Sequence, residues 1–315
     1  MDTTPLMNKK WKIEDVPDQT GRRILITGAN SGLGFKSTEV LASKGAEVIM
    51  AVRNTEKGED AKRRILDKYS DAKLDLMKLD LSSLKSIKEF ADNFSKKYDS
   101  LNVLLNNAGV MQPPYRKTED GFELQFGVNH LGHFALTAYL LPILQKTEGS
   151  RVISQSSIAH LSGSINFDDI NSEKKYGRTS AYGQSKIANL YFAYELNRQL
   201  QKTGSSVISL AVHPGYTSTE LQQNGPTVGG KSFLSRLYTV TNKIMGQKVE
   251  KGVLPMLYAA TMEDVHGGDY IGPKGLKGAR GYAQRVKSNK RSYDEDIARR
   301  LWELSEEMTG VTYKF

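Results

Sequence analysis

Cysteine is absent from this 315-residue sequence. Its absence excludes disulfides, thiol nucleophiles and cysteine-ligated metals, and it fits a cytoplasmic protein. No apolar run approaches the ~20 residues that cross a bilayer, and the first residues lack the apolar core of a secretory signal. We therefore expect no transmembrane segment, a polar N-terminal leader over residues 1–21, and a single domain over residues 22–315.

Negative charge is in deficit, because 35 acidic residues stand against 44 Lys and Arg and leave a net charge of +9. Such a surplus suits an acidic partner, either nucleic acid or a phosphorylated small molecule. However, Lys and Glu interleave in stretches such as NTEKGEDAKRRILDKY, and no basic block with stacking aromatics stands out. We therefore predict solvated helix faces and no nucleic-acid partner. The oligomeric state, a homo-oligomer included, is left open.

Internal repeats are also lacking, and strand and helix patterns alternate instead. Short apolar or alternating runs predict strands at 23–27, 46–52, 73–80, 101–105, 151–156, 205–212 and 268–272. Helical patterns fill the intervals, and a further one covers about residues 290–308. The alternation predicts an α/β fold of the doubly wound Rossmann type, with a mostly parallel seven-stranded sheet and helices on both faces.

Ligands of such sheets bind beyond the carboxyl ends of the strands, so a motif gains weight when it follows a strand. The stretch TGANSGLG (27–34) does so, with Gly28, Gly32 and Gly34 between the first strand and a helix. Glycine lets the backbone approach a pyrophosphate, and the helix start offers free N–H groups. The spacing differs from the best-known dinucleotide fingerprint, and a plain turn is the alternative interpretation.

Further motifs follow the later strands in order. They are NNAG (106–109), Asn129 within FGVNHLGHF, the doublet Ser156 and Ser157, YGQSK (182–186) and HPG (213–215). With the glycine motif, this set resembles the short-chain dehydrogenase/reductase family. Within this family, the chain looks most like the retinol dehydrogenase and protochlorophyllide reductase branch. The features that carry this likeness are the interval from Ser157 to Tyr182, SSIAH and IARRLWELSEEMTG. The resemblance implies an oxidoreductase that acts on a small hydrophobic alcohol, aldehyde or ketone.

The resemblance also implies which residues bind the nicotinamide cofactor. Asp80 and Leu81 match the pair that contacts adenine, and the segment after the sixth strand matches PGxxxT, which holds the nicotinamide, with Thr217 as a substitute for Thr219. The implied cofactor-binding set is Gly28, Asn30, Ser31, Gly32, Leu33, Gly34, Asp80, Leu81, Asn107, Ala108, Gly109, Tyr182, Lys186, Pro214, Gly215, Thr217 and Thr219.

The end of the second strand bears on the choice of cofactor. An acidic residue there would bind the ribose 2′-hydroxyl of NAD, but the strand ends in MAVRN, with Val52 in that place and Arg53 next. An arginine fork can bind a 2′-phosphate. We therefore predict NADP(H) over NAD(H), with a surface arginine that has no ligand as the alternative.

Tyr-x-x-x-Lys occurs three times, at Tyr69, Tyr182 and Tyr270. Only Tyr182 and Lys186 open a long helical pattern, in which residues four apart share a face. A free tyrosine has a pKa near ~10, and a nearby ammonium favours the phenolate. We predict Tyr182 as general acid and base. By resemblance, Lys186 also binds the nicotinamide ribose.

The remaining catalytic assignments also follow from the resemblance. Ser157 would hold the substrate oxygen, with Ser156 as the fallback, and Asn129 would anchor a water in a proton relay to the lysine. A catalytically silent NADP(H)-binding sensor is the alternative function. No metal is predicted, because His130 and His133 lack a third ligand at suitable spacing. A hydrolase is unsupported, because no GxSxG surrounds Ser157.

One irregular stretch, residues 216–247, contains the glycine pair Gly229 and Gly230 and a short amphipathic pattern that includes Phe233 and Leu237. Two interpretations fit it equally. It is a lid over the substrate pocket, or it is an ordinary packed helix. The substrate itself is not identified, because the walls of its pocket lie in irregular segments of this kind.

Overall fold

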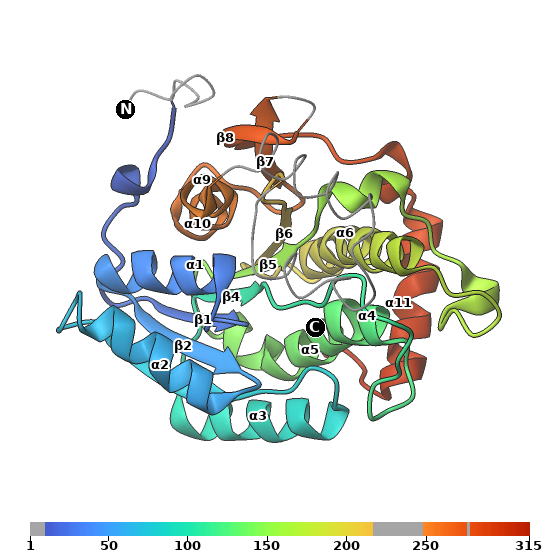
Figure 1. Ribbon diagram of the computed structural model, residues 1–315, viewed down its shortest axis with the longest axis horizontal. Helices are drawn as coiled ribbons and strands as arrows, with labels where there is room; N and C mark the ends of the chain where they lie inside the picture. The colour runs from blue at the N-terminus through green and yellow to red at the C-terminus, as the bar shows by residue number, and fades with distance from the viewer. Residues whose placement is uncertain (1–9, 217–247, 276–277) are drawn as a thin grey trace, which may run out of the picture.

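The structure, a computed structural model, describes residues 10–216, 248–275 and 278–315. Among these residues, eight strands form one sheet in the order β3-β2-β1-β4-β5-β6-β7-β8 (Figure 1). The strands are β1 Arg23–Thr27, β2 Glu47–Val52, β3 Lys73–Lys78, β4 Val103–Asn106, β5 Arg151–Gln155, β6 Ile208–Val212, β7 Tyr270–Gly275 and β8 Arg280–Arg285. The chain thus forms the doubly wound α/β fold that the alternation predicts.

The predicted strand count of seven is wrong, because β8 adds an eighth, antiparallel strand beside β7. Its sequence, RGYAQR, buries only Ala283 and carries no apolar run. Such a strand is stabilised by pairing with its neighbour rather than by its own burial. An antiparallel edge strand on an otherwise parallel sheet is common in large sheets.

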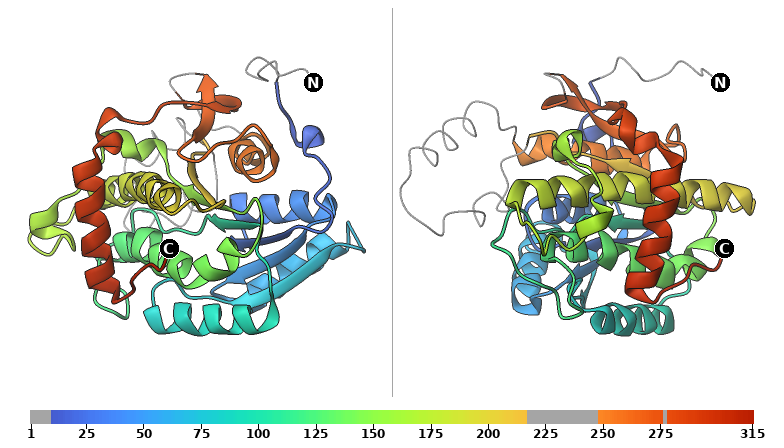
Figure 2. Two further views of the ribbon diagram at one scale, coloured as in Figure 1. Left: turned by 180° about the vertical axis from the view of Figure 1, so that it is seen from behind. Right: turned by 90° about the vertical axis from the view of Figure 1, so that its right-hand side faces the viewer.

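Helices cover both faces of the sheet (Figure 2). One apolar core lies under α1 Gly32–Ser43, α2 Thr55–Leu66, α9 Val249–Gly252 and α10 Leu254–Thr261, and the other under α3 Leu84–Lys97, α5 Gly132–Gln145 and α6 Arg178–Lys202. Ile24, Leu25 and Ile26 of β1 are fully buried, as expected for a parallel strand covered on both sides. Helix α11, Glu295–Thr309, packs on α6.

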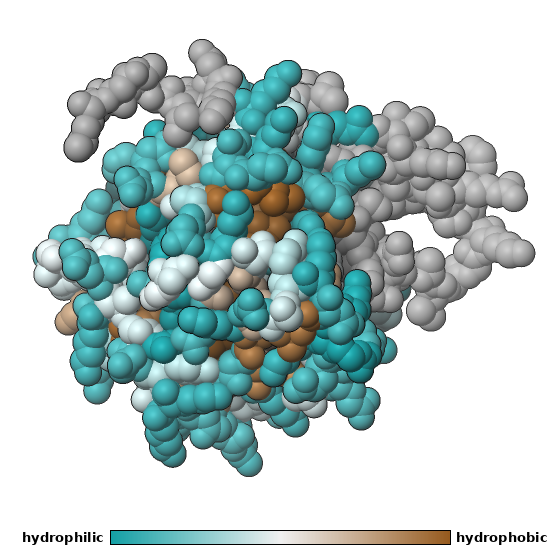
Figure 3. All heavy atoms as spheres, turned by 90° about the vertical axis from the view of Figure 1, so that its left-hand side faces the viewer, coloured by the Kyte–Doolittle hydropathy of each residue, from teal (hydrophilic) through white to brown (hydrophobic). Residues whose placement is uncertain are grey.

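The packed unit extends to the N-terminal side of residue 22. Trp11 is only 3% exposed, and its ring meets the ring of Tyr258 on α10 edge-on, with centroids 5.2 Å apart. Val16 is buried beside it in the same core. The face in Figure 3 is mostly hydrophilic, and hydrophobic atoms show mainly near its centre. In the described part of the chain, no helix combines the length and apolarity that a membrane span requires.

The helical pattern predicted between the strands at 101–105 and 151–156 is interrupted in the structure. The chain forms a short helix, α4 Leu124–Phe126, then a π-helical turn over Gly127–Leu131, and only then α5. The N–H of Gly132 bonds to the carbonyl of Gly127, five residues earlier. Turns of this kind occur frequently at functional sites, and this one contains Asn129.

Short 3₁₀ turns occur at Ile13–Asp15, Ile158–Ser162, Phe167–Asp169 and Lys290–Tyr293. The last of these shortens the predicted C-terminal helix, because Asp294 accepts the N–H groups of Asp296 and Ile297 and so starts α11 at Glu295. Of the stretch 216–247, for which a lid and a packed helix are the two interpretations, residues 217–247 lie outside the described residues.

Candidate active site

The predicted motifs meet at one edge of the sheet. Strands β1 to β6 are parallel neighbours, so their carboxyl ends share an edge. The residues that directly follow five of these strands are Gly28, Arg53, Asn107, Ser156 and His213, and Asp80 lies two positions after β3. The structure therefore brings the sequence motifs together where a ligand of such a sheet would bind.

The glycine motif forms a tight turn from β1 into α1. Gly28 and Gly32 have φ of 68° and 53°, in the region that side chains disfavour. A Cβ on Gly34 would lie 2.2 Å from the carbonyl oxygen of Gly28 and 2.6 Å from the side-chain nitrogen of Asn107. Glycine is therefore required at position 34, because this packing holds the helix start against the turn. Leu33 is buried in the adjacent core.

Thr27 ties the glycine turn to the NNAG segment. Its hydroxyl oxygen accepts the backbone N–H groups of Asn107 and Ala108, each at 2.9 Å. The Asn107 side chain donates to the Thr27 carbonyl at 2.8 Å. Thr27 is the first residue of the stretch TGANSGLG, but the motif alone predicted no role for it. Its position as the last residue of β1 is the signal that could have marked it.

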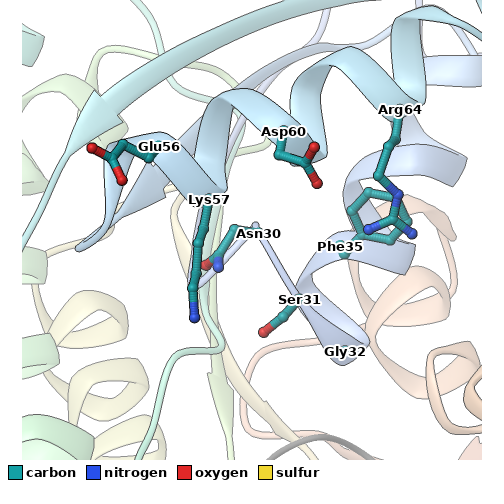
Figure 4. Close-up of a pocket in the computed structure, with 8 residues that line it drawn as sticks. All are labelled: Asn30, Ser31, Gly32, Phe35, Glu56, Lys57, Asp60 and Arg64. Atoms are coloured by element: carbon teal, nitrogen blue, oxygen red, sulfur yellow. The ribbon is translucent and has the colours of Figure 1, made fainter.

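A cavity of about 500 Å³ opens between the glycine turn and α2 (Figure 4). In Figure 4 the side chain of Lys57 extends toward the Asn30 turn, whereas the Arg64 guanidinium lies over the Phe35 ring, 4.6 Å from its centroid. The cavity is lined by Asn30, Ser31, Gly32, Phe35, Glu56, Lys57, Asp60 and Arg64.

Arg53 is exposed on the segment between β2 and α2 and does not line this cavity. Sequence reasoning missed Lys57. Asn54 caps α2 by accepting the N–H of Lys57 at 2.9 Å, so α2 starts at the same edge of the sheet as the glycine turn. This N-cap was the available signal that the first turn of α2 would face the ligand side.

Asp80 and Leu81 lie in the loop that follows β3. The Asp80 carboxylate accepts the backbone N–H and the hydroxyl of Ser82, at 2.9 Å and 2.6 Å. Leu81 is buried, and a Cβ on Gly132 would lie 2.6 Å from its carbonyl oxygen. This pair therefore anchors the loop after β3 against α5.

Tyr182 and Lys186 lie on α6, one turn apart. The Lys186 ammonium donates to the carbonyl of Gln155 at 3.2 Å and lies 5.7 Å from the centroid of the Tyr182 ring. Lys186 is only 4% exposed, and burial lowers its pKa to about 8. Burial raises the pKa of Tyr182, against a hydrogen bond with Ser157 that lowers it. Desolvation, rather than the expected effect of the lysine, therefore dominates the tyrosine pKa.

The two serines of the doublet differ. Ser156 is 1% exposed, and its hydroxyl donates to the carbonyl of Lys186 at 2.8 Å, so it points into the α6 backbone. Ser157 is partly buried, accepts the N–H of Ala159 at 3.3 Å and lies within hydrogen-bonding reach of Tyr182. The geometry therefore favours Ser157 over Ser156 as the hydroxyl on the ligand side.

Asn129 holds the loop after β4. Its side-chain oxygen accepts the Val110 N–H at 2.7 Å, and its nitrogen donates to the Val110 carbonyl at 3.0 Å and to the Ser185 hydroxyl at 2.9 Å. A Cβ on Gly109 would lie 2.9 Å from the Asn129 side-chain oxygen and 3.5 Å from the Lys186 nitrogen. Asn129 and Gly109 thus adjoin the buried lysine.

The segment after β6 is described only in part. Gly215 has φ of 71°, and its N–H donates to the His213 ring at 3.3 Å. Pro214 lies between them. Thr217 and Thr219, which the resemblance assigned to the cofactor, lie outside the described residues.

The buried histidines are held by hydrogen bonds to neighbouring groups of the fold. His130 bonds to the Ser305 hydroxyl at 2.9 Å, and the ring of His160 bonds to the Ser157 carbonyl at 2.5 Å. Across residues 10–216, 248–275 and 278–315, no three His, Asp or Glu side chains are grouped so as to hold a metal ion.

The other two Tyr-x-x-x-Lys matches separate as expected. Tyr69 lies in the turn after α2, whereas Lys73 starts β3. Tyr270 and Lys274 both lie on β7, a strand, where residues four apart are far from each other along the chain. Of the three matches, only the pair on α6 brings its phenol and its ammonium together.

Comparison with known proteins agrees with this arrangement. The family model described as short chain dehydrogenase matches residues 22–227. Retinol dehydrogenase 12 of Mus musculus is 40% identical over 296 residues, which cover 93% of this chain and 88% of the relative. Retinol dehydrogenase 13 of Homo sapiens is 40% identical over 294 residues, with 92% and 85% covered.

Two solved structures extend the comparison. An uncharacterized protein from Mycobacterium paratuberculosis matches with a TM-score of 0.81 and 40% identity, over 98% of this chain and all of that one. The RhlG/NADP complex of Pseudomonas aeruginosa matches with a TM-score of 0.63 over 80% of this chain and 94% of that one. At 23% identity, the second match shows a common fold alone.

Proposed function

Because this chain belongs to the short-chain dehydrogenase family, we propose that it interconverts a hydrophobic alcohol and its aldehyde or ketone with NADP(H) as the cofactor. The observation that carries this proposal is the convergence of Tyr182, Lys186 and Ser157 beside the edge of the sheet that holds the glycine turn. The names of the relatives support the substrate class. They are retinol dehydrogenases and, at 36% identity over 313 residues, the polyprenol dehydrogenase of Danio rerio.

The glycine turn fits a dinucleotide. A Cβ at position 34 would meet the Gly28 carbonyl, so the helix start packs closely on the turn, as the third glycine of a dinucleotide motif allows. The Ser31 side chain makes no cap bond to α1, which leaves its hydroxyl and the first helix N–H groups for the anion. We assign the pyrophosphate to the turn of residues 28–34 and the adenine to Asp80 and Leu81. Asn107, Ala108 and Gly109 would flank the cofactor, and Pro214, Gly215, Thr217 and Thr219 would hold the nicotinamide.

For the 2′-phosphate we propose two cations, Arg53 and Lys57. Support comes from the missing acid at the end of β2 and from Lys57 on the cavity wall. Glu56 and Asp60 line the same cavity and oppose an anion, so a single cation would be a weak site. Arg53, which lies outside the lining of this cavity, would add a second positive charge from the end of β2.

When bound, the nicotinamide would donate hydride to the carbonyl carbon or accept it from the alcohol carbon. In reduction, Tyr182 gives its phenolic proton to the carbonyl oxygen, and the Ser157 hydroxyl donates a hydrogen bond to the same oxygen. The Lys186 ammonium then stabilises the phenolate that remains until a proton from solvent restores it. In oxidation the proton moves the opposite way.

A screen of NADPH consumption with apolar aldehydes and ketones tests this function. We expect turnover with at least one of them, and a Tyr182→Phe variant that is slower by about 10²-fold or more, because the phenolic proton is lost. Equal rates in parent and variant would remove Tyr182 from the mechanism. NADPH binding without turnover of any substrate would instead support a catalytically silent sensor.

Titration of NADPH and NADH tests the cofactor assignment. We expect Arg53→Ala and Lys57→Ala each to weaken NADPH binding by about tenfold and to leave NADH binding unchanged, since each removes a charged contact to the phosphate. Arg64→Ala is the matched control. It removes a positive charge from the same cavity, but one that lies over Phe35. Equal losses for both cofactors would contradict the assignment.

A further inference from the structure

His133 lies inside the molecule, between the glycine turn and the Tyr182–Lys186 end of α6. It is 2% exposed, and both ring nitrogens have partners. Nδ1 lies 3.0 Å from the carbonyl oxygen of Asn129, and Nε2 lies 2.9 Å from the hydroxyl of Thr27. One ring therefore connects the π-helical turn to the last residue of β1.

The partners determine where the protons lie. A carbonyl oxygen only accepts, so Nδ1 carries the hydrogen and donates it to Asn129. Nε2 is then an acceptor, and the Thr27 hydroxyl donates to it. The other acceptor within reach of that hydroxyl, the Leu105 carbonyl, is farther away at 3.4 Å. The Thr27 oxygen is left to accept the two N–H groups of Asn107 and Ala108.

Contacts continue from His133 in both directions. On one side, Thr27 holds the NNAG segment and the end of the glycine turn. On the other, the Asn129 side chain bonds to Val110 and to the Ser185 hydroxyl, which itself donates to the carbonyl of Tyr182 at 2.9 Å. Burial lowers the pKa of His133 to about 4, so the ring is neutral at physiological pH.

We propose that His133 is a positioning residue that sets Asn129, and through it the Tyr182–Lys186 end of α6, in register with the turn that receives the cofactor. This inference rests on the proposed oxidoreductase function and assigns His133 no contact with substrate or cofactor. Its two bonds have separate consequences. The bond to Thr27 supports cofactor binding, and the bond to Asn129 supports the proton-transfer residues.

Two substitutions separate the bonds. His133→Asn keeps an amide donor near the position of Nδ1 and removes the contact with Thr27. His133→Gln reaches toward Thr27 and leaves the Asn129 carbonyl without its donor. We expect His133→Asn to weaken NADPH binding by about fivefold, as for one lost hydrogen bond, with kcat near that of the parent.

For His133→Gln we expect the opposite division. NADPH affinity stays near that of the parent, kcat falls by about tenfold because the proton-transfer residues are misplaced, and the pH profile of kcat shifts. Thr27→Val removes the same contact from the other side, together with the acceptor of the Asn107 and Ala108 N–H groups, so it should weaken NADPH binding more than His133→Asn does. Thr27→Ser, which keeps the hydroxyl, should bind NADPH as the parent does. The Thr27 pair tests whether the hydroxyl at position 27 supports cofactor binding even where a His133 variant does not fold.

His130→Asn is the matched control. His130 is a buried histidine three residues earlier, and its ring bonds to Ser305 on α11 rather than to the site. We expect it to lower the melting temperature while the NADPH affinity and the pH profile of kcat stay unchanged. His133 variants that behave like His130→Asn, with lower stability alone, would overturn the proposal.

Failure of this inference is distinguishable from failure of the proposed function. If the parent turns over no carbonyl compound, the oxidoreductase proposal fails, and direct NADPH titration still compares the variants. A weaker affinity in His133→Asn and Thr27→Val, but not in His133→Gln and Thr27→Ser, would then support the link to the cofactor turn. Equal affinity in all four would refute it.

Discussion

The glycine turn after β1 and the Tyr182–Lys186 end of α6 lie at the same edge of the sheet but are built in opposite ways. The turn relies on close backbone packing at Gly34 and contains no titratable side chain between residues 28 and 34. The α6 end buries Lys186 and raises the pKa of Tyr182. The difference teaches that the glycine turn, the proposed binding half, is organised for a fixed shape. The α6 end, the proposed chemical half, keeps titratable groups in environments that lower stability.

Mild acid should lower the free energy of unfolding more than any substitution below, and it acts on buried histidines outside the glycine turn. Burial lowers the pKa of His133 to about 4 and those of His130 and His213 to about 3, from 6.5. Each neutral ring makes its full contribution to the free energy of unfolding above pH 6.5. This contribution is lost as the pH falls toward the pKa of that histidine in the folded protein. At pH 5 each histidine should cost roughly 2 kcal/mol.

Thermal denaturation from pH 7.5 to pH 4.5 measures this loss. A His213→Asn variant, which removes one of the three rings, should show a shallower fall of melting temperature with pH than the parent. Identical slopes in the two proteins would show that this histidine is not neutral in the folded state.

Gly34→Ala should have the next largest effect and breaks the binding half. The added methyl would meet the Gly28 carbonyl at 2.2 Å, where backbone and not a movable side chain must shift. We expect a loss of about 3 kcal/mol or more in the free energy of unfolding, and NADPH binding too weak to titrate. Denaturant unfolding checks the first expectation. Gly121→Ala, at φ of 88° with nothing within 4 Å of an added Cβ, measures the cost of backbone strain without a clash and should be milder.

Lys186→Met should change stability in the other direction. The folded pKa of Lys186 lies near 8 rather than 10.5, so the charged lysine destabilises the fold below pH 8, and this penalty is relieved as the pH rises from 8 to 10.5. Methionine should therefore raise the free energy of unfolding at pH 7 by up to roughly 3 kcal/mol, while activity is lost. The Gln155 carbonyl keeps a donor in Asn189, at 2.9 Å.

The stability gain of Lys186→Met should shrink between pH 8 and pH 10.5, and melting curves of parent and variant across that range measure it. A variant that is less stable than the parent at pH 7 would contradict the view that the buried Lys186 ammonium lowers the stability of this fold.

The smallest stability changes are expected in the serine doublet, where the two alanine variants should separate a structural serine from a catalytic one. Ser156→Ala removes the bond to the Lys186 carbonyl and should lower the free energy of unfolding by about 1 kcal/mol. Ser157→Ala should leave stability nearly unchanged and lower kcat. Paired measurements of melting temperature and kcat decide this. A larger loss of kcat in Ser156→Ala would return the catalytic role to Ser156.

Several features could be predicted because they depend on neighbours in sequence. The seven strands with apolar or alternating patterns, the glycine turn at a strand end and the helix that carries Tyr182 and Lys186 are all local signals. The family resemblance, which rests on the order of short motifs, is confirmed by the match over residues 22–227. Thr217 and Thr219 remain predictions, since they lie outside the described residues.

Other features had no local signal. Strand β8 buries only Ala283 and exists through its pairing with β7. Apolar spacing does not separate a π turn from an α-helix, so the interruption around Asn129 could not be foreseen. The Asn54 N-cap signals where α2 starts, but Lys57 faces the glycine turn only because α1 and α2 cover the same face of the sheet.

The sequence alone determined the alternation of strands and helices, the glycine turn and the choice of Tyr182 over two other tyrosines, because each depends on residues a few positions apart. Only the tertiary structure decided which side chains meet across the sheet edge. Thr27 and His133 are 106 positions apart, yet their atoms lie 2.9 Å from each other. Such a contact depends on the packing of β1 against α5, and packing is a property of the whole chain.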